Sequence, residues 1–260
     1  MKIRATQFAV HDDPQKNLSF IDSEVDAAAT DGIRMIVLPE GLIARSPDDD
    51  NYAVRSAQQL NGPFVHKLCE LSKRGVAIAG TFHIAHEQQV LNMALVFDHG
   101  EVIQRYDKLH LYDAFNSKES EHVTAGTSPP STFAIDDVEV GIITCYDVRF
   151  PEIARDLALQ GADLVLVPAA WVRGPLKEDH WRSMLIARAL ENTMYVVGCG
   201  EASSRNVGMS VAIDPLGVIL ARTVNCVDRI DVEIDLEHLQ RARTALPLLH
   251  NMKYRAPALK

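Results

Sequence analysis

The sequence predicts an α/β fold, a mixed sheet with helices packed against its faces. Apolar stretches of strand length alternate with segments whose apolar residues recur at helical spacing, and hairpin signals interrupt the alternation. Residues 33–38 are apolar almost throughout, which is typical of a strand buried on both faces. No linker rich in Gly, Ser or Pro divides the chain, so we expect a single domain over residues 1–260.

The first elements follow from local signals. Residues 3–10 predict a strand, and Asp13-Pro14 resembles a helix start, with a capping carboxylate before a first-turn proline. The residues that follow at helical spacing would cover one face of the sheet: Leu18, Ile21, Val25 and Ala28. The buried strand at 33–38 comes next, and Glu40 lies just beyond its end.

The next cycle has the same form. A helix carries Phe64, Leu68 and Leu71 and ends near Gly75, and a strand covers residues 76–82. Two further strands, 92–97 and 102–106, flank the hairpin signal Asp98-His99-Gly100, and Lys108 follows the hairpin.

A long polar connection over residues 113–130 leads into the second half. There a strand at 138–144 is followed at once by Cys145. The further predicted elements are a helix at 151–160, a strand at 164–167, a helix at 180–192, a strand at 195–198, a strand pair around Asp214-Pro215-Leu216-Gly217 and a helix at 236–244. The order strand-helix-strand-helix-hairpin thus occurs about twice, which predicts an internal pseudo-repeat.

Composition and charge exclude several function classes. Lys and Arg total 26 against 35 Asp and Glu, a net charge of -9 that repels phosphate backbones, so nucleic acid is not an expected partner. The first residues lack the features of a signal peptide, and no apolar run approaches the roughly 18 residues of a membrane span, so we expect no membrane association. The scattered cysteines predict a reducing, cytoplasmic location; three of them are expected to be small buried residues: Cys69, Cys199 and Cys226.

Three residues beside predicted strands have the chemistry that amide cleavage needs. Cys145 supplies a nucleophile, and Lys108 a cation that lowers the thiol pKa and stabilises an oxyanion. Glu40 supplies a base that takes the thiol proton, returns it to the leaving amine and then activates water. The backbone N–H of Tyr146 is the expected second oxyanion donor.

Each of the three residues alone would favour a simpler interpretation. Cys145 would be a core residue, Glu40 a carboxylate at a helix start, and Lys108 a solvated charge. Their joint occurrence favours the catalytic interpretation.

The stretches that carry these residues resemble the nitrilase superfamily of carbon–nitrogen hydrolases. They are L-P-E around Glu40, Y-D-K-L-H-L around Lys108 and C-Y-D-V-R-F-P-E from Cys145, and the resemblance covers nearly the whole chain. It implies a four-layer α-β-β-α sandwich, assembly into homodimers or larger homo-oligomers, and a Glu-Lys-Cys triad. In this triad Glu40 is the general base, Lys108 stabilises the oxyanion and Cys145 is the nucleophile.

Family members often carry a second glutamate after the lysine. Here the stretch K-E-S-E-H-V-T-A-G offers Glu119 and Glu121, and branches that read Q-E-S match Glu119 better. Within the superfamily the chain resembles the deaminated-glutathione amidase and omega-amidase branch, through K-L-H-L-Y-D, A-R-A-L-E-N-T-M-Y-V-V-G and L-P-L-L-H-N. The resemblance implies an amide substrate that also bears an acid group. Residues 169–173 depart from that branch's S-A-F-like sequence, so the substrate stays open.

Candidate substrate-binding residues are less sharply defined. Arg149 and Arg173 each offer a planar fork for a carboxylate, although an ion pair with Glu152 or Asp147 is the preferred expectation for Arg149. Trp171 either forms a pocket wall or packs in the core.

No cofactor is implied. His83-x-x-His86 lacks the spacing of a zinc-protease helix, and no G-x-G-x-x-G or phosphate loop is present. We therefore expect a cofactor-free and metal-free thiol amidase. The alternatives are a nitrilase or acyl-transferring enzyme of the same superfamily, and a metabolite-binding protein without catalysis.

Overall fold

The computed structural model describes residues 1–46, 48–49, 51–115 and 117–254. Their strands form two six-stranded sheets. In spatial order, the first sheet contains β12 (Asp228–Glu233), β1 (Lys2–Gln7), β2 (Met35–Val37), β3 (Ala77–His86), β4 (Gln89–Asp98) and β5 (Glu101–Asp107). The second contains β11 (Ile219–Arg222), β10 (Val211–Ile213), β9 (Tyr195–Gly200), β8 (Leu164–Ala169), β7 (Val138–Ile142) and β6 (Phe133–Ile135).

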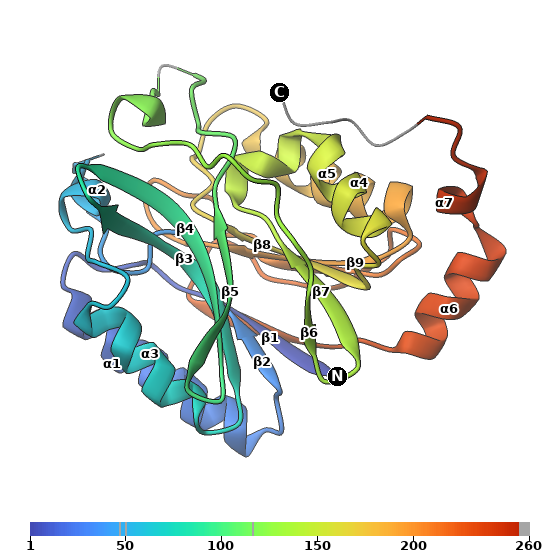
Figure 1. Cartoon of the computed structure of the whole chain (residues 1–260), viewed down its shortest axis with the longest axis horizontal. Helices are drawn as coiled ribbons and strands as arrows, with labels where there is room; N and C mark the ends of the chain where they lie inside the picture. Colours follow the sequence, from blue (N-terminus) through green and yellow to red (C-terminus); the bar gives the residue numbers. More distant parts are fainter. Residues whose placement is uncertain (47, 50, 116, 255–260) are drawn as a thin grey trace.

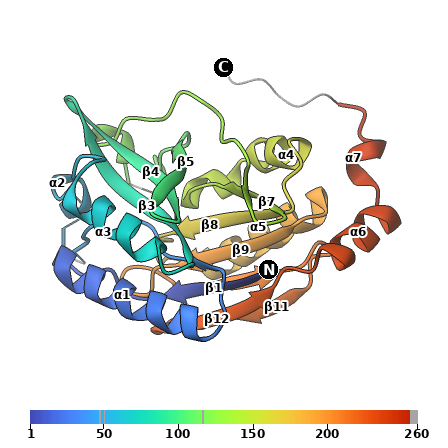
Figure 2. The same ribbon diagram turned by 60° about the horizontal axis from the view of Figure 1, so that its bottom comes forward.

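Helices cover the outer face of each sheet (Figures 1 and 2). The first sheet is covered by α1 (Pro14–Thr30) and α3 (Pro63–Ser72), and the second by α4 (Pro151–Leu159) and α5 (Lys177–Asn192). This arrangement confirms the predicted α-β-β-α sandwich. The remaining elements are α2 (Tyr52–Arg55), α6 (Leu236–Ala245), α7 (Leu248–Asn251) and two 3-10 turns, η1 (Glu119–Glu121) and η2 (Cys145–Arg149). No helix among the described residues has the length and apolarity needed to cross a membrane.

The two sheets share one pattern of strand directions. In each sheet three adjacent parallel strands, β1-β2-β3 or β7-β8-β9, are followed by two antiparallel ones. An antiparallel edge strand, β12 or β6, pairs with the other side of the trio. The predicted pseudo-repeat is therefore present in the topology. Because parallel strands end at a common edge, residues just after β2 and β7 occupy equivalent places.

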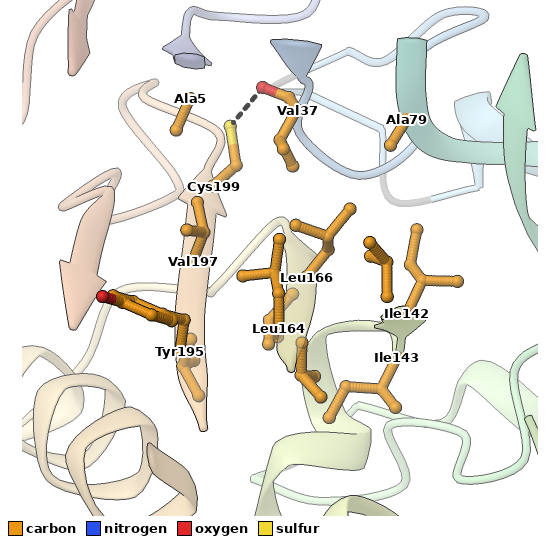
Figure 3. Close-up of a cluster of buried hydrophobic side chains, with 14 of the residues drawn as sticks. Ala5, Val37, Ala79, Ile142, Ile143, Leu164, Leu166, Tyr195, Val197 and Cys199 are labelled. Carbon is orange, nitrogen blue, oxygen red and sulfur yellow. Dashed lines mark hydrogen bonds between the residues drawn. The ribbon is translucent and has the colours of Figure 1, made fainter. Parts of the chain in front are cut away.

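The inner faces of the two sheets form the main core (Figure 3). Small side chains of the first sheet, such as Ala5 and Ala79, face branched ones of the second, such as Leu164 and Leu166. The Cys199 thiol crosses this interface and donates to the carbonyl oxygen of Val37 at 3.2 Å. Close packing of these apolar side chains thus fixes the strand ends of one sheet relative to those of the other.

Most predicted elements occur close to their expected bounds, and the differences have physical causes. The first strand ends at Gln7 rather than at residue 10. The strand expected at 76–82 extends to His86 because it pairs along its length with β4. Two cysteine predictions are wrong. Cys226 is exposed because it lies in the turn after β11, and Cys69 is only partly buried.

Gly200 provides a test of the packing at the end of β9. A Cβ atom on Gly200 would lie 2.0 Å from the carbonyl oxygen of Gly208, a backbone atom that cannot move aside alone. We expect Gly200→Ala to lower the free energy of unfolding by about 3 kcal/mol, measured by urea denaturation. Gly32→Ala is the matched control, with φ +70° but open space around the added carbon, and should cost about 1 kcal/mol. Equal losses in the two variants would contradict the close approach.

Candidate active site

The residues predicted to act together come from four separate segments. Glu40 follows β2, Lys108 follows β5, Glu119 begins η1 and Cys145 begins η2 after β7. Glu40 and Cys145 thus lie at the carboxyl ends of parallel strands in the two facing sheets, where α/β folds place ligands.

Lys108 joins the two carboxylates. Its Nζ atom donates to Glu40 Oε1 at 3.1 Å and to Glu119 Oε2 at 2.9 Å, and its side chain is only 2% exposed. Glu121, the alternative to Glu119, is 58% exposed and pairs with Lys118 instead. The structure therefore brings Glu119 to the site and leaves Glu121 at the surface.

Asn92, a residue that the sequence did not single out, connects both carboxylates. Its Nδ2 donates to Glu40 Oε1 at 2.8 Å and to Glu119 Oε1 at 3.1 Å. Backbone N–H groups complete the arrangement, with Ala170 donating to Glu40 Oε2 at 2.8 Å and Tyr112 to Glu119 Oε2 at 2.7 Å. Every oxygen of both carboxylates accepts a hydrogen bond, so both side chains are fixed.

Charge balance sets the ionisation of Glu40 and Lys108. Burial alone would raise the pKa of Glu40, but the Lys108 ammonium, with smaller contributions from Arg45 and hydrogen bonds, lowers it to about 2. Burial alone would lower the pKa of Lys108, yet the charges of Glu119 and Glu40 raise it above its ordinary value. Glu40 is therefore a carboxylate and Lys108 an ammonium at neutral pH.

Cys145 stands beside this charged cluster. It is 7% exposed and has a left-handed backbone, with φ +47°, at the first position of η2. Burial raises its pKa well above the ordinary value; Glu40 adds to the rise by its charge and a hydrogen bond, and Lys108 opposes it. Lys108 thus lowers the thiol pKa, as expected, but burial and Glu40 outweigh it and the resting sulfur keeps its proton. A protonated thiol faces an ionised carboxylate, which can accept its proton.

Asp147 ties the turn that carries Cys145 to the segment that carries Lys108. Its carboxylate is fully buried and accepts from Tyr106 Oη at 2.8 Å, from the His110 N–H at 3.0 Å and from the Thr144 N–H at 3.0 Å. These partners leave no ion pair with Arg149, so the expected pairing of Arg149 with Asp147 or Glu152 is wrong.

The three predicted substrate-binding residues, Tyr146, Trp171 and Arg173, lie in different surroundings. Tyr146 follows Cys145, and its ring packs edge-on against Tyr112 at 5.1 Å. Trp171 is buried in the core, next to Ala170. Arg173 is not brought to the cluster, because its guanidinium lies 3.4 Å from the carbonyl of Ser203 and 4.0 Å from Glu178.

The described residues hold no group of three His, Cys, Asp or Glu side chains suited to a metal ion. His83 is buried near the carboxylates, and burial, aided by Arg45, lowers its pKa to about 4. It is therefore neutral at physiological pH, and it adds no charge to the cluster.

Comparisons with known proteins identify the family to which the chain belongs. The sequence matches the carbon-nitrogen hydrolase family over residues 2–244. It is 41% identical to a deaminated glutathione amidase of Escherichia coli O157:H7 over the full length of both chains. A chloroplastic omega-amidase of Arabidopsis thaliana is 34% identical, covering 93% of this chain and 69% of that protein. A solved amidase variant from Nesterenkonia sp. AN1, whose active-site cysteine carries an acrylamide adduct, has a TM-score of 0.78 and 26% identity, covering 96% of this chain and 98% of the other.

The electrostatic balance at Cys145 predicts a measurable change in its titration. Because the Glu40 carboxylate raises the thiol pKa, Glu40→Gln should lower the pKa of Cys145. The ultraviolet absorbance of the thiolate, followed against pH, measures this shift. The same titration of Cys145→Ala gives the absorbance of the other three cysteines, which is then subtracted. A wild-type Cys145 that is already ionised at neutral pH would contradict the arrangement.

Proposed function

Because this chain belongs to the carbon–nitrogen hydrolase family, we propose that it is a thiol amidase that hydrolyses small carboxylate-bearing amides through a thioester on Cys145. The single observation that carries this proposal is the cluster of one ammonium and two carboxylates beside a buried thiol. We propose that it acts as a single-domain, cofactor-free cytoplasmic enzyme, assembled as a homodimer or larger oligomer.

The proposed reaction begins with a proton transfer. Glu40 takes the proton of Cys145 as the sulfur attacks the amide carbon, and the carbonyl oxygen becomes an oxyanion. Lys108 has three N–H bonds, of which two are used by Glu40 and Glu119, so one is left for this oxyanion. The N–H of Tyr146 is the proposed second donor.

The second half of the reaction regenerates the thiol. Glu40 gives its proton to the leaving nitrogen, which departs as ammonia or an amine and leaves the acyl group on sulfur. Glu40 then takes a proton from water as the water oxygen attacks the thioester, and the sulfur leaves and recovers that proton as the acid forms. Glu119 holds Lys108 in place throughout by its 2.9 Å bond, which is a positioning role.

The names of the relatives suggest the substrate class. One is a deaminated glutathione amidase and another an omega-amidase, at 41% and 34% identity. Deaminated glutathione and the omega-amides of α-keto dicarboxylic acids share an amide at one end of a short acyl chain and a carboxylate near the other end. We propose a substrate of this kind.

Amide hydrolysis tests the proposed reaction directly. The purified protein should release ammonia from omega-amides of α-keto acids, or an amine from deaminated glutathione. Cys145→Ala should reduce this rate at least about 1,000-fold, because no thioester can form. Cys69→Ala, which removes a partly exposed thiol, should change little. Intact amides alongside hydrolysed nitriles would point to a nitrilase, and ligand binding without turnover to a non-catalytic protein.

The two glutamates of η1 should differ in their effect on the reaction. Glu119→Gln should reduce kcat about 100-fold, because Lys108 loses a charged partner and its fixed position. Glu121→Gln alters an exposed carboxylate two residues away and should leave kcat unchanged. Steady-state kinetics on one amide measures kcat for both variants. Equal effects of the two changes would refute the proposed role of Glu119.

A further inference from the structure

Two cationic side chains, surrounded by aromatic rings, lie beside Cys145. The proposed reaction uses neither cation. They are Arg149, the last residue of η2, and Lys177, the first residue of α5. Four rings surround them, and we call these four residues the aromatic box: Tyr112, Phe115, Tyr146 and Trp171.

Arg149 has an unused hydrogen-bonding edge. Its guanidinium carbon lies 4.8 Å from the ring centre of Trp171 and 5.7 Å from that of Tyr146. Its Nε and Nη2 atoms are buried and have no hydrogen-bond partner among the described residues. Because these two nitrogens lie on the same edge of the guanidinium, their N–H bonds are nearly parallel and match the two oxygens of one carboxylate.

Lys177 is also buried without an acidic partner in the described part of the chain. It is 4% exposed; its Nζ donates to the hydroxyl of Tyr112 at 2.8 Å and lies 4.3 Å from the ring centre of Phe115. The preceding residue, Leu176, is left-handed with φ +59°, a strained conformation for leucine. This turn immediately precedes α5, whose first residue is Lys177.

The two cations would repel each other unless an anion lay between them. Burial and the charge of Arg149 both lower the pKa of Lys177, so the groups interact directly. The nearby acidic residues are engaged elsewhere: Asp147 with Tyr106 and His110, Glu178 with Arg173, and Asp179 with Arg182. Contacts with ring faces offset only part of the cost of holding the buried Lys177 ammonium beside the half-buried Arg149 guanidinium. An anionic ligand between the two groups would supply the missing negative charge.

We propose that Arg149 and Lys177, inside the aromatic box, bind the carboxylate of the substrate while its amide lies at Cys145. The site is continuous with the thiol, since Arg149 and Tyr146 belong to the turn that Cys145 begins. The Tyr146 ring packs against that of Tyr112, whose hydroxyl accepts from Lys177. This inference rests on the proposed function, and it names the residues that select an acid-bearing amide over a neutral one.

The test measures binding without requiring turnover. Glutarate, a short dicarboxylate, should protect Cys145 from iodoacetamide, as measured by the mass of the Cys145 peptide, and glutaramide should protect far less. In Lys177→Met and in Arg149→Met, the glutarate concentration for half-protection should rise about 10- to 100-fold, as expected for losing one charged hydrogen-bonding partner. Arg182→Met, which removes an exposed cation from the same helix, should leave it unchanged.

Kinetics then separates this inference from the proposed function. The ratio of kcat/KM for an acid-bearing amide to that for its neutral analogue should fall about 10- to 100-fold in Lys177→Met, and Lys177→Arg should restore part of it. Protection by glutarate that is equal in wild type and both Met variants would overturn the inference, even if the protein is an amidase. Absence of turnover with intact, variant-sensitive protection would overturn only the proposed function.

Discussion

The buried ammonium of Lys108 is the interaction on which the site depends. An ion taken out of water costs several kcal/mol, and breaking such a buried pair leaves an uncompensated charge. Glu40 and Glu119 offset this cost, and Asn92 with two backbone N–H groups satisfies their remaining oxygens. Since the partners come from distant parts of the chain, the same contacts that keep Lys108 charged also hold those segments together. Stability and catalysis therefore rest on the same bonds.

The same charge balance sets the protonation state of the Cys145 thiol before substrate binds. Two carboxylates surround one ammonium, so the cluster is net negative and disfavours a second anion on sulfur. Burial reinforces this, and the pKa of the Cys145 thiol rises while that of Glu40 falls to about 2. The thiol keeps its proton until a substrate carbonyl arrives to accept the developing charge. Such a site protects the sulfur from adventitious oxidation, which acts mainly on exposed thiolates.

The sequence predicts correctly those features that depend on the order of neighbouring residues. Strand ends are visible as changes from apolar to polar residues, so Glu40, Lys108 and Cys145 could be placed at the edges of a sheet. Burial of a charge depends on distant partners and leaves no local pattern: Lys177 looks like an ordinary polar helix start. Asn92 was recognisable in principle, as one amide inside the apolar strand β4. The sequence favours Glu152 or Asp147 as a partner of Arg149, because it cannot show that Tyr106 and His110 already bond to Asp147.

The two sets of cations have different partners, and this gives an acid-bearing amide one direction of binding. Lys108 is already neutralised by fixed carboxylates, so it attracts a substrate carboxylate weakly, while its remaining N–H bond is directed to the oxyanion that forms on the carbonyl oxygen. Arg149 and Lys177 have no acidic partner in the described chain, so a full negative charge is most favourable there. A substrate bound in reverse would put its carboxylate beside Glu40 and Glu119.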